Sequence, residues 1–167
     1  MQPQWQKEQW FTMYSIPDKF QFKLEEPFLH EKLFIGSQYG WLIVLDQHCE
    51  PFLFNPLTGE SIPLPSITTL LTVRPCHSIT GDIVSYFAII YCFIEDSSPF
   101  SYYTHEDYLR EITFKKVVIS SNPSVVSSNF VAAALVGLVS DLVGVGPDKG
   151  TWNLLREEEL YMDIMFR

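Results

Sequence analysis

The sequence predicts an all-β fold of many short antiparallel strands, and three observations support this prediction. Aromatic residues make up 15% of the chain and it contains 11 prolines, a mixture of strand formers and turn formers that favours strands over helices. Short apolar segments recur at an even spacing between turn-forming residues. No long amphipathic helical pattern alternates with them, which disfavours a doubly wound fold. The pattern is typical of a sandwich, a barrel or a propeller.

The first expected element is a hairpin near the N-terminus. In Lys19–Leu24, apolar residues alternate with the polar Gln21 and Lys23, which is the period-two pattern of a half-buried strand. The aromatic-rich segment Phe11–Ser15 precedes it, and Ile16–Asp18 has the composition of a turn. We therefore expect these two strands to pair.

A meander of three short strands is expected next. Gly40–Leu45 is a continuous apolar run of strand length, and Pro51–Phe54 and Glu60–Leu64 are two further short strands. Asp46–His48 predicts the first tight turn. Asn55–Gly59 predicts the second, because its proline presets φ and its glycine can adopt a positive φ.

The remainder of the chain contains further short strands and one short helical segment. Ser97–His105 has the composition of a loop, and Glu106–Arg110 predicts one helical turn. A propeller blade takes about 40–50 residues, so a propeller of this length would hold between three and four blades. The expected strands are Ile83–Ile94, Phe114–Ser120, Phe130–Leu135, Leu138–Val145, Thr151–Leu155 and Tyr161–Phe166.

Length and charge limit the classes of function. A chain of 167 residues is long enough for one domain, which we take to span residues 1–167. The net charge is −9, and no cluster of basic residues exceeds the pair Lys115–Lys116. Because a nucleic-acid binder needs a cationic surface, neither nucleic acid nor an anionic membrane is an expected partner.

The cysteines and the apolar runs indicate a reducing compartment. Cys49, Cys76 and Cys92 are odd in number and widely spaced, which does not fit a disulfide framework. The N-terminal residues are polar and lack the apolar core of a signal peptide. The apolar runs Ile83–Ile94 and Phe130–Val145 are shorter or more interrupted than a spanning helix of roughly 20 residues. The prediction is a cytoplasmic or nuclear protein.

No catalytic, cofactor-binding or metal site is predicted, and no residue is assigned to partner binding. His48–Cys49 and Cys76–His77 pair possible zinc ligands, but neighbouring residues on a strand point to opposite faces. Asp141, inside an apolar run, is interpreted as a turn or sheet-edge residue. A hydrolase remains the alternative from another class, and it would need a pocket that gathers His77 or His105 with an acid and a nucleophile.

Five motifs together resemble one family. Gly36–Leu42 reads G-S-Q-Y-G-W-L and resembles the signature G-S-S-H-G-W-L. Leu53–Pro65 is similar to L-L-N-P-F-T-G-x-x-I-x-L-P, and Lys115–Ser124 is similar to K-V-V-L-S-S-N-P-S. Gly146–Trp152 resembles the turn R-P-G-D-K-x-W-T, and Tyr161–Ile164 resembles the strand start Y-E-D-V. Their order and approximate spacing also agree.

The family is the KIB-type β-propeller of plant F-box proteins, once catalogued as a plant domain of unknown function. The resemblance extends from about Phe11 to Phe166, with Tyr39 in place of the usual histidine and Gly146–Asp148 in place of R-P-G-D. It implies a partial β-propeller of about three to four antiparallel blades with an incomplete ring. No F-box is recognised before Trp5, and Leu64–Leu71 imitates the start of one only superficially.

The resemblance also implies a function. The chain would be a non-enzymatic protein-interaction module, similar to the propeller that recognises substrates of a ubiquitin ligase, without cofactors. Its partner would be an unidentified target protein, and without an F-box it would not bind the ligase adaptor. Open sheet edges invite self-association and marginal stability. The alternatives are a degenerate fragment without a stable function and a small hydrolase on a β-scaffold.

The motif residues are expected to serve the scaffold before they serve a partner. Trp41 should pack between neighbouring sheets, and the Asn55 side chain should bond to its own turn. Asp148 and Lys149 should lie at a turn tip.

Overall fold

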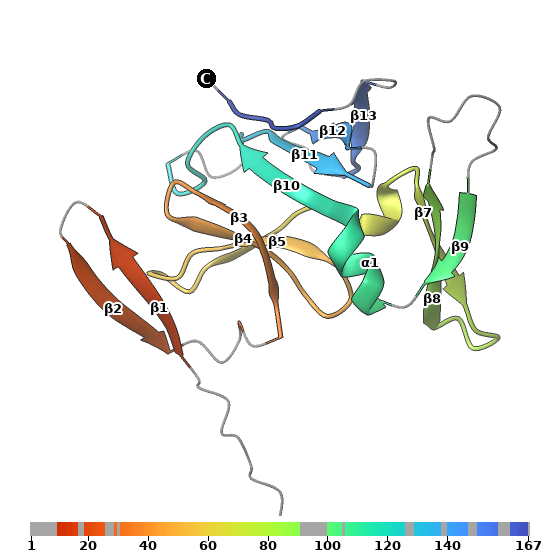
Figure 1. Cartoon of the computed structure of the whole chain (residues 1–167), viewed down its shortest axis with the longest axis horizontal. Helices are drawn as coiled ribbons and strands as arrows, with labels where there is room; N and C mark the ends of the chain where they lie inside the picture. The colour runs from red at the N-terminus through yellow and green to blue at the C-terminus, as the bar shows by residue number, and fades with distance from the viewer. Residues whose placement is uncertain are drawn as a thin grey trace, which may run out of the picture. The chain divides into compact units, whose positions relative to one another are not determined.

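The structure is a computed structural model that describes residues 10–16, 19–25, 29, 31–90, 100–104, 106–125, 129–137, 140–146, 150–156 and 161–166. The chain divides into two compact units, Met1–Lys32 and Leu33–Arg167. Figure 1 shows their strands and helices.

The first unit contains the predicted N-terminal hairpin. Strand β1 spans Trp10–Ser15 and pairs antiparallel with β2, Phe20–Glu25. The turn contains Lys19 in the left-handed region, with φ of 52°. The prediction of a hairpin here is confirmed.

The second unit opens with a four-stranded antiparallel sheet in which the expected meander forms three strands. The sequence analysis missed the fourth, β3, because its pattern is irregular: the pairing register shifts between Phe34 and Gly36, and the strand is only half-buried. The strands of this sheet are β3 (Leu33–Gln38), β4 (Trp41–Leu45), β5 (Pro51–Phe54) and β6 (Ser61–Pro63).

The second sheet has three strands among the described residues, and the sequence analysis predicted only one of them. After the short 3₁₀ helix η2 (Ile67–Thr69), the sheet consists of β7 (Val73–His77), β8 (Ile83–Ile90) and β9 (Phe100–Thr104). The predicted loop was wrong over β9, because pairing with β8 makes this aromatic run a strand. Helix α1 (Glu106–Thr113) is longer than the single predicted turn.

The third sheet confirms the buried hairpin expected in the C-terminal half. Gly137 lies in the turn between β11 and β12 with φ of 72°. The strands are β10 (Phe114–Ile119), β11 (Ala132–Val136), β12 (Asp141–Val145) and β13 (Asn153–Arg156). The predicted strand at Tyr161–Phe166 was wrong. This segment is irregular, and Asp163 forms an ion pair with Lys116 of β10.

The three sheets of the second unit share one hydrophobic core. Each is an open antiparallel meander in chain order, as in the blades of a partial β-propeller, and Figure 1 shows β10 lying along β3. Strand β11 is buried along its whole length. It pairs with β10 on one side and with β12 on the other. The largest fully buried side chains of the core include Trp41, Tyr86, Phe130, Ile43, Leu53 and Ile119.

Candidate functional site

The contact between β3 and β10 joins the first sheet to the third. Ser120, which follows β10, donates its N–H to the carbonyl of Val131, on the side of β11. Successive residues of a strand direct their backbone groups to alternate sides. The backbone groups of Ile119 and Val117 in β10 therefore point away from β11. The outward N–H of Ile119 donates to Oε1 of Gln38 at 2.9 Å. A polar side chain of β3 thus completes the hydrogen bonding of an edge strand.

A glycine allows this close approach. A Cβ atom on Gly36 would lie 3.0 Å from the carbonyl oxygen of Val117 and 3.3 Å from Cδ1 of Ile43. Contacts that short are tighter than ordinary van der Waals packing, and one of the two atoms belongs to the backbone. The first motif therefore needs glycine at this position for the two strands to meet.

Trp41 joins the first sheet to the loop that follows β10. Its side chain is 1% exposed, and its indole Nε1–H donates to Oδ1 of Asn122 at 3.3 Å and to Oγ of Ser124 at 3.2 Å. Tyr39 donates its hydroxyl to the carbonyl of Ser120 at 3.4 Å. The prediction that Trp41 packs between sheets is confirmed.

A second tryptophan joins the other pair of motifs. Nε1 of Trp152 donates to the carbonyl of Pro65 at 2.9 Å, and the backbone N–H of Trp152 donates to Oγ1 of Thr69 at 3.1 Å. The indole also packs on Phe114, with ring centroids 5.7 Å apart. The first motif thus contacts the third, and the second contacts the fourth. Considering each motif separately could not reveal this pairing.

The Asn55–Gly59 turn forms the bonds that the sequence indicates. Oδ1 of Asn55 accepts from the backbone N–H of Leu57 at 2.9 Å and of Thr58 at 3.3 Å. Gly59 donates to the carbonyl of Asn55 and has φ of 73°. The prediction of an asparagine that bonds to its own turn is confirmed, and the turn backbone is held in one conformation.

Three turns lie together at one end of the joined sheets. In the first sheet, the β3–β4 and β5–β6 turns share an end because the strands are antiparallel and sequential. Hydrogen bonds from Trp41 and Tyr39 bring the β10–β11 loop to the same end. We call this surface the turn end and define it as Tyr39–Gly40, Asn55–Glu60 and Ser120–Val125.

The turn end carries exposed apolar side chains on a fixed backbone. Leu57 is 80% exposed, Val125 is 78% exposed and Tyr39 is 49% exposed. The polar residues around them are bonded to each other: Oγ1 of Thr58, for example, donates to Oε2 of Glu60 at 3.2 Å. Fixed apolar side chains surrounded by polar residues are typical of surfaces that bind a protein partner.

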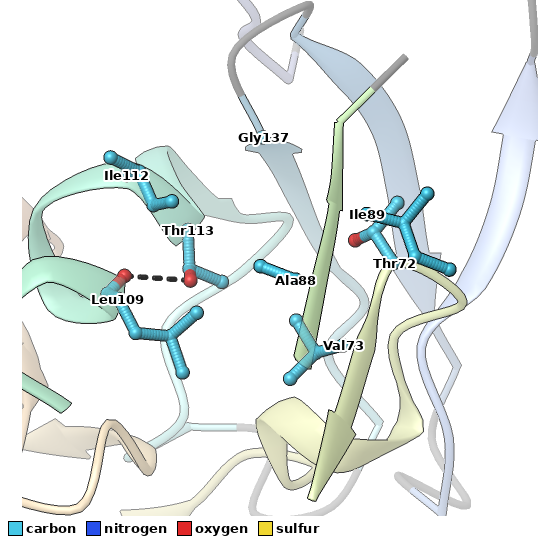
Figure 2. Close-up of a pocket in the computed structure, with 8 residues that line it drawn as sticks. All are labelled: Thr72, Val73, Ala88, Ile89, Leu109, Ile112, Thr113 and Gly137. Carbon is cyan, nitrogen blue, oxygen red and sulfur yellow. Dashed lines mark hydrogen bonds between the residues drawn. The ribbon is translucent and has the colours of Figure 1, made fainter. Parts of the chain in front are cut away.

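A small cavity lies elsewhere, between the second sheet and α1. Figure 2 shows its lining, in which Val73 and Ala88 come from the sheet and Leu109 from the helix. The hydroxyl of Thr113 is occupied by the carbonyl of Leu109 at 2.7 Å. The internal volume is about 20 Å³, which is space for about one water molecule. It does not fit an organic substrate, and no histidine or acid lines it.

The residues considered for chemistry lie apart from this cavity. His48 and His77 are exposed on different sheets, Cys49 is buried, and neither Cys49 nor Cys76 forms a disulfide. Within the described ranges, no three His, Cys, Asp or Glu side chains could hold a metal ion. His105, Cys92, Asp148 and Lys149 lie outside the residues or side chains described.

Asp141 is half-buried and is the first residue of β12, beside the turn at Gly137, as its interpretation as a turn or edge residue requires. Among the residues that the structure describes, no helix has the length and apolar character needed to cross a membrane.

Two carboxyl groups have shifted pKa values, each for a local reason. Burial raises the pKa of Glu50, while the hydrogen bond that Ser66 donates to its Oε1 at 2.7 Å acts in the opposite direction. The hydrogen bond from Lys116 lowers the pKa of Asp163. Each carboxyl connects two segments of the chain, Glu50 through Ser66 and Asp163 through Lys116.

Comparison with known families agrees with this architecture. The sequence pattern described as KIB1-4 beta-propeller matches residues 13–167. No curated protein and no solved structure shows a significant match to the chain. The match includes all three sheets and the motif pairs that join them. The chain therefore belongs to the KIB1-4 beta-propeller family.

Proposed function

We propose that this chain is a non-enzymatic protein-interaction module that holds a target protein at the turn end. The observation that supports this proposal is the set of exposed apolar side chains of Tyr39, Leu57 and Val125 on turns whose backbone is fixed by hydrogen bonds. A surface fixed before binding loses little conformational entropy when a partner docks. Affinity can then come from a few apolar contacts.

The resemblance to propellers of F-box proteins supports a more specific role. In those proteins the F-box docks to the ubiquitin-ligase core, and the propeller presents the target. We propose that this chain performs the presenting step, with an unidentified target in the cytoplasm or nucleus. The purified chain should not bind the ligase adaptor directly, and robust binding in a pulldown would overturn that part of the proposal.

The test replaces exposed apolar residues at the turn end with a charge. Leu57→Glu and Val125→Glu should each reduce the yield of target captured by proximity labelling at least tenfold, because a desolvated carboxylate opposes apolar contact. Ile79→Glu is the matched control, since Ile79 is fully exposed on the β7–β8 turn, away from the turn end.

All variants should melt at the wild-type temperature, because these side chains contribute little to the core. The proposal requires one set of proteins that the wild type and Ile79→Glu both label and the turn-end variants do not. If the three variants label the same proteins equally, the turn end is not the binding surface.

A further inference from the structure

Strand β9 forms an edge of the second sheet. Within the described residues this sheet has three strands in the order β7–β8–β9, whereas the sheets before and after it each have four. No described strand pairs with the outer side of β9. Within the part of the chain that the structure describes, no strand takes the position beside β9 that the fourth strand takes in the neighbouring sheets.

The register shows which backbone groups face that position. Ile89 directs its N–H to β7, and successive residues of a strand direct their backbone groups to alternate sides. Ala88 therefore faces β9, where its partner is Tyr102. It follows that Tyr102 points back towards β8, while the N–H and C=O groups of Ser101 and Tyr103 point outward.

The opposite edge of the same sheet is protected. In β7 the outward residues are Val73 and Pro75, by the same alternation. The N–H of Val73 donates to the carbonyl of Leu70 at 3.3 Å, and proline has no N–H to offer. Proline at the outward position of an edge strand is a known protection against pairing with another chain.

The other edges of the second unit are also short, covered or charged. Strand β6 has three residues and ends at Pro63, β13 ends at Arg156, and β3 and β10 cover each other. Strand β9 differs from them: it has five residues, Phe-Ser-Tyr-Tyr-Thr, with neither a charge nor a proline. An unprotected edge of this composition is suited to pairing.

We propose that an extended segment of the target adds to β9 as a fourth strand, through main-chain hydrogen bonds to Ser101 and Tyr103. This is the mode of recognition by strand addition. The inference rests on the proposed function for the existence of a target, and it adds the conformation that the bound segment takes.

Charge indicates the chemistry of that segment. After β9 and one histidine, His105, the chain continues with the acidic Glu106 and Asp107, and the whole chain carries a net charge of −9. A segment with basic residues flanking its paired core would be attracted to this edge. A second copy of this chain brings the same acidic residues and the same net charge. At this edge we therefore expect a basic partner segment in place of the self-association that open sheet edges invite in general.

A synthetic peptide tests the proposal directly. The probe is Lys-Lys-Val-Thr-Val-Thr-Val-Lys-Lys, and the matched control has glutamate in place of lysine. We expect the lysine peptide to bind at least tenfold more tightly than the glutamate peptide in 0.1 M salt. Methylating alternate backbone nitrogens of the lysine peptide should abolish binding, because main-chain donors are lost while the protein is unchanged.

Two protein variants locate the binding edge. Ser101→Pro removes one outward N–H without removing a hydrogen bond to β8, and it should weaken peptide binding at least tenfold. Ser101→Ala keeps the N–H and should bind like the wild type. Amide hydrogen exchange gives a second readout: the peptide should slow exchange at Ser101 and Tyr103 and leave the inward amide of Tyr102 unaffected.

The outcomes separate this inference from the proposed function. If the peptide fails to bind, or protects other amides, strand addition at β9 is wrong, while loss of target capture in Leu57→Glu would still support the turn end. If sedimentation shows a dimer of the wild type that Ser101→Pro converts to a monomer, a second copy occupies the edge and the basic-segment proposal is overturned.

Discussion

Strands β10 and β9 are both edge strands, and they differ in what their outward backbone groups contact. Each outward backbone group of β10 that is described in detail meets the first sheet: the N–H of Ile119 bonds to Gln38, and the carbonyl of Val117 lies against Gly36. Strand β9 presents Ser101 and Tyr103 with no described strand beside them. Among the strands that the structure describes, one edge contacts a neighbouring sheet and the other pairs with no further strand.

The comparison teaches that edge protection is encoded in a few residues. Gly36, Gln38 and Trp41 of one motif contact β10 and the loop after it. In β7, Pro75 has no outward N–H, and the outward N–H of Val73 is bonded to Leu70. Because each device is local, single substitutions can test it. The expected effects are given below from the largest to the smallest.

The largest effect is expected from Trp41→Ala, which empties a fully buried site between the sheets. Loss of a buried aromatic typically costs about 3–5 kcal/mol, which is a large share of a total stability of about 5–15 kcal/mol. Denaturant unfolding followed by circular dichroism measures it. Trp41→Phe keeps the ring system partly and should cost less. A loss below about 1 kcal/mol for the alanine variant would show that the contact does not depend on the indole.

A smaller loss is expected from Gly36→Ala, which pushes β3 and β10 apart. The added Cβ meets the backbone oxygen of Val117 at 3.0 Å, and overpacking of this kind typically costs about 1–3 kcal/mol. Gly150→Ala is the control, because a Cβ there has nothing within 4 Å. Equal stabilities of the two variants would contradict the close approach.

A loss of about 1 kcal/mol is expected from Gln38→Ala, which removes the acceptor for the N–H of Ile119. Amide exchange at Ile119 should accelerate at least fivefold, towards the rates of the outward amides of β9. The exposed neighbour Ser37 provides the control as Ser37→Ala. Unchanged exchange at Ile119 would mean that the side chain does not protect this edge.

The smallest effect is expected from Glu50→Gln, and it depends on pH. Burial raises the pKa of Glu50 in the folded chain, so ionisation opposes folding. Wild-type stability should therefore fall as pH rises from the unfolded pKa through the higher folded pKa. The glutamine variant should lack this fall and be at least as stable as the wild type at pH 8. Chemical unfolding at pH 4 and pH 8 compares them, and a variant that is less stable only at pH 8 would reverse the sign.

Much of the fold could be predicted from local patterns. The N-terminal hairpin, the β4–β6 meander and the β11–β12 hairpin all have apolar runs bounded by turn formers. The bonds of Asn55 follow from its own turn, because partner and donor lie within three residues. Strands β3, β7 and β9 escaped prediction, since glycine, proline or a loop-like composition masks them until a neighbouring strand supplies the hydrogen bonds.

The candidate surface was harder to predict than the fold. Leu57 lies in a motif that the sequence presents as structural, and its exposure follows only from the turn geometry. Val125 has no local signal, because Tyr39 and Leu57, the other exposed apolar residues of the turn end, lie on other turns. The expected strand at Tyr161–Phe166 failed for a related reason: its pattern fits a strand, but no described strand pairs with it.

The sequence by itself determined the family, the all-β class and the turns, because these depend on residues close together in the chain. Only the tertiary structure decided that the motifs contact one another in pairs, that glycine and glutamine seat β10 on β3, and that β9 is left as an edge. The first two of these properties depend on contacts between residues more than 80 positions apart, as in the bonds from Trp41 to Asn122 and from Trp152 to Pro65. No local pattern specifies such a contact, because it stabilises the fold only when both segments have already taken their places.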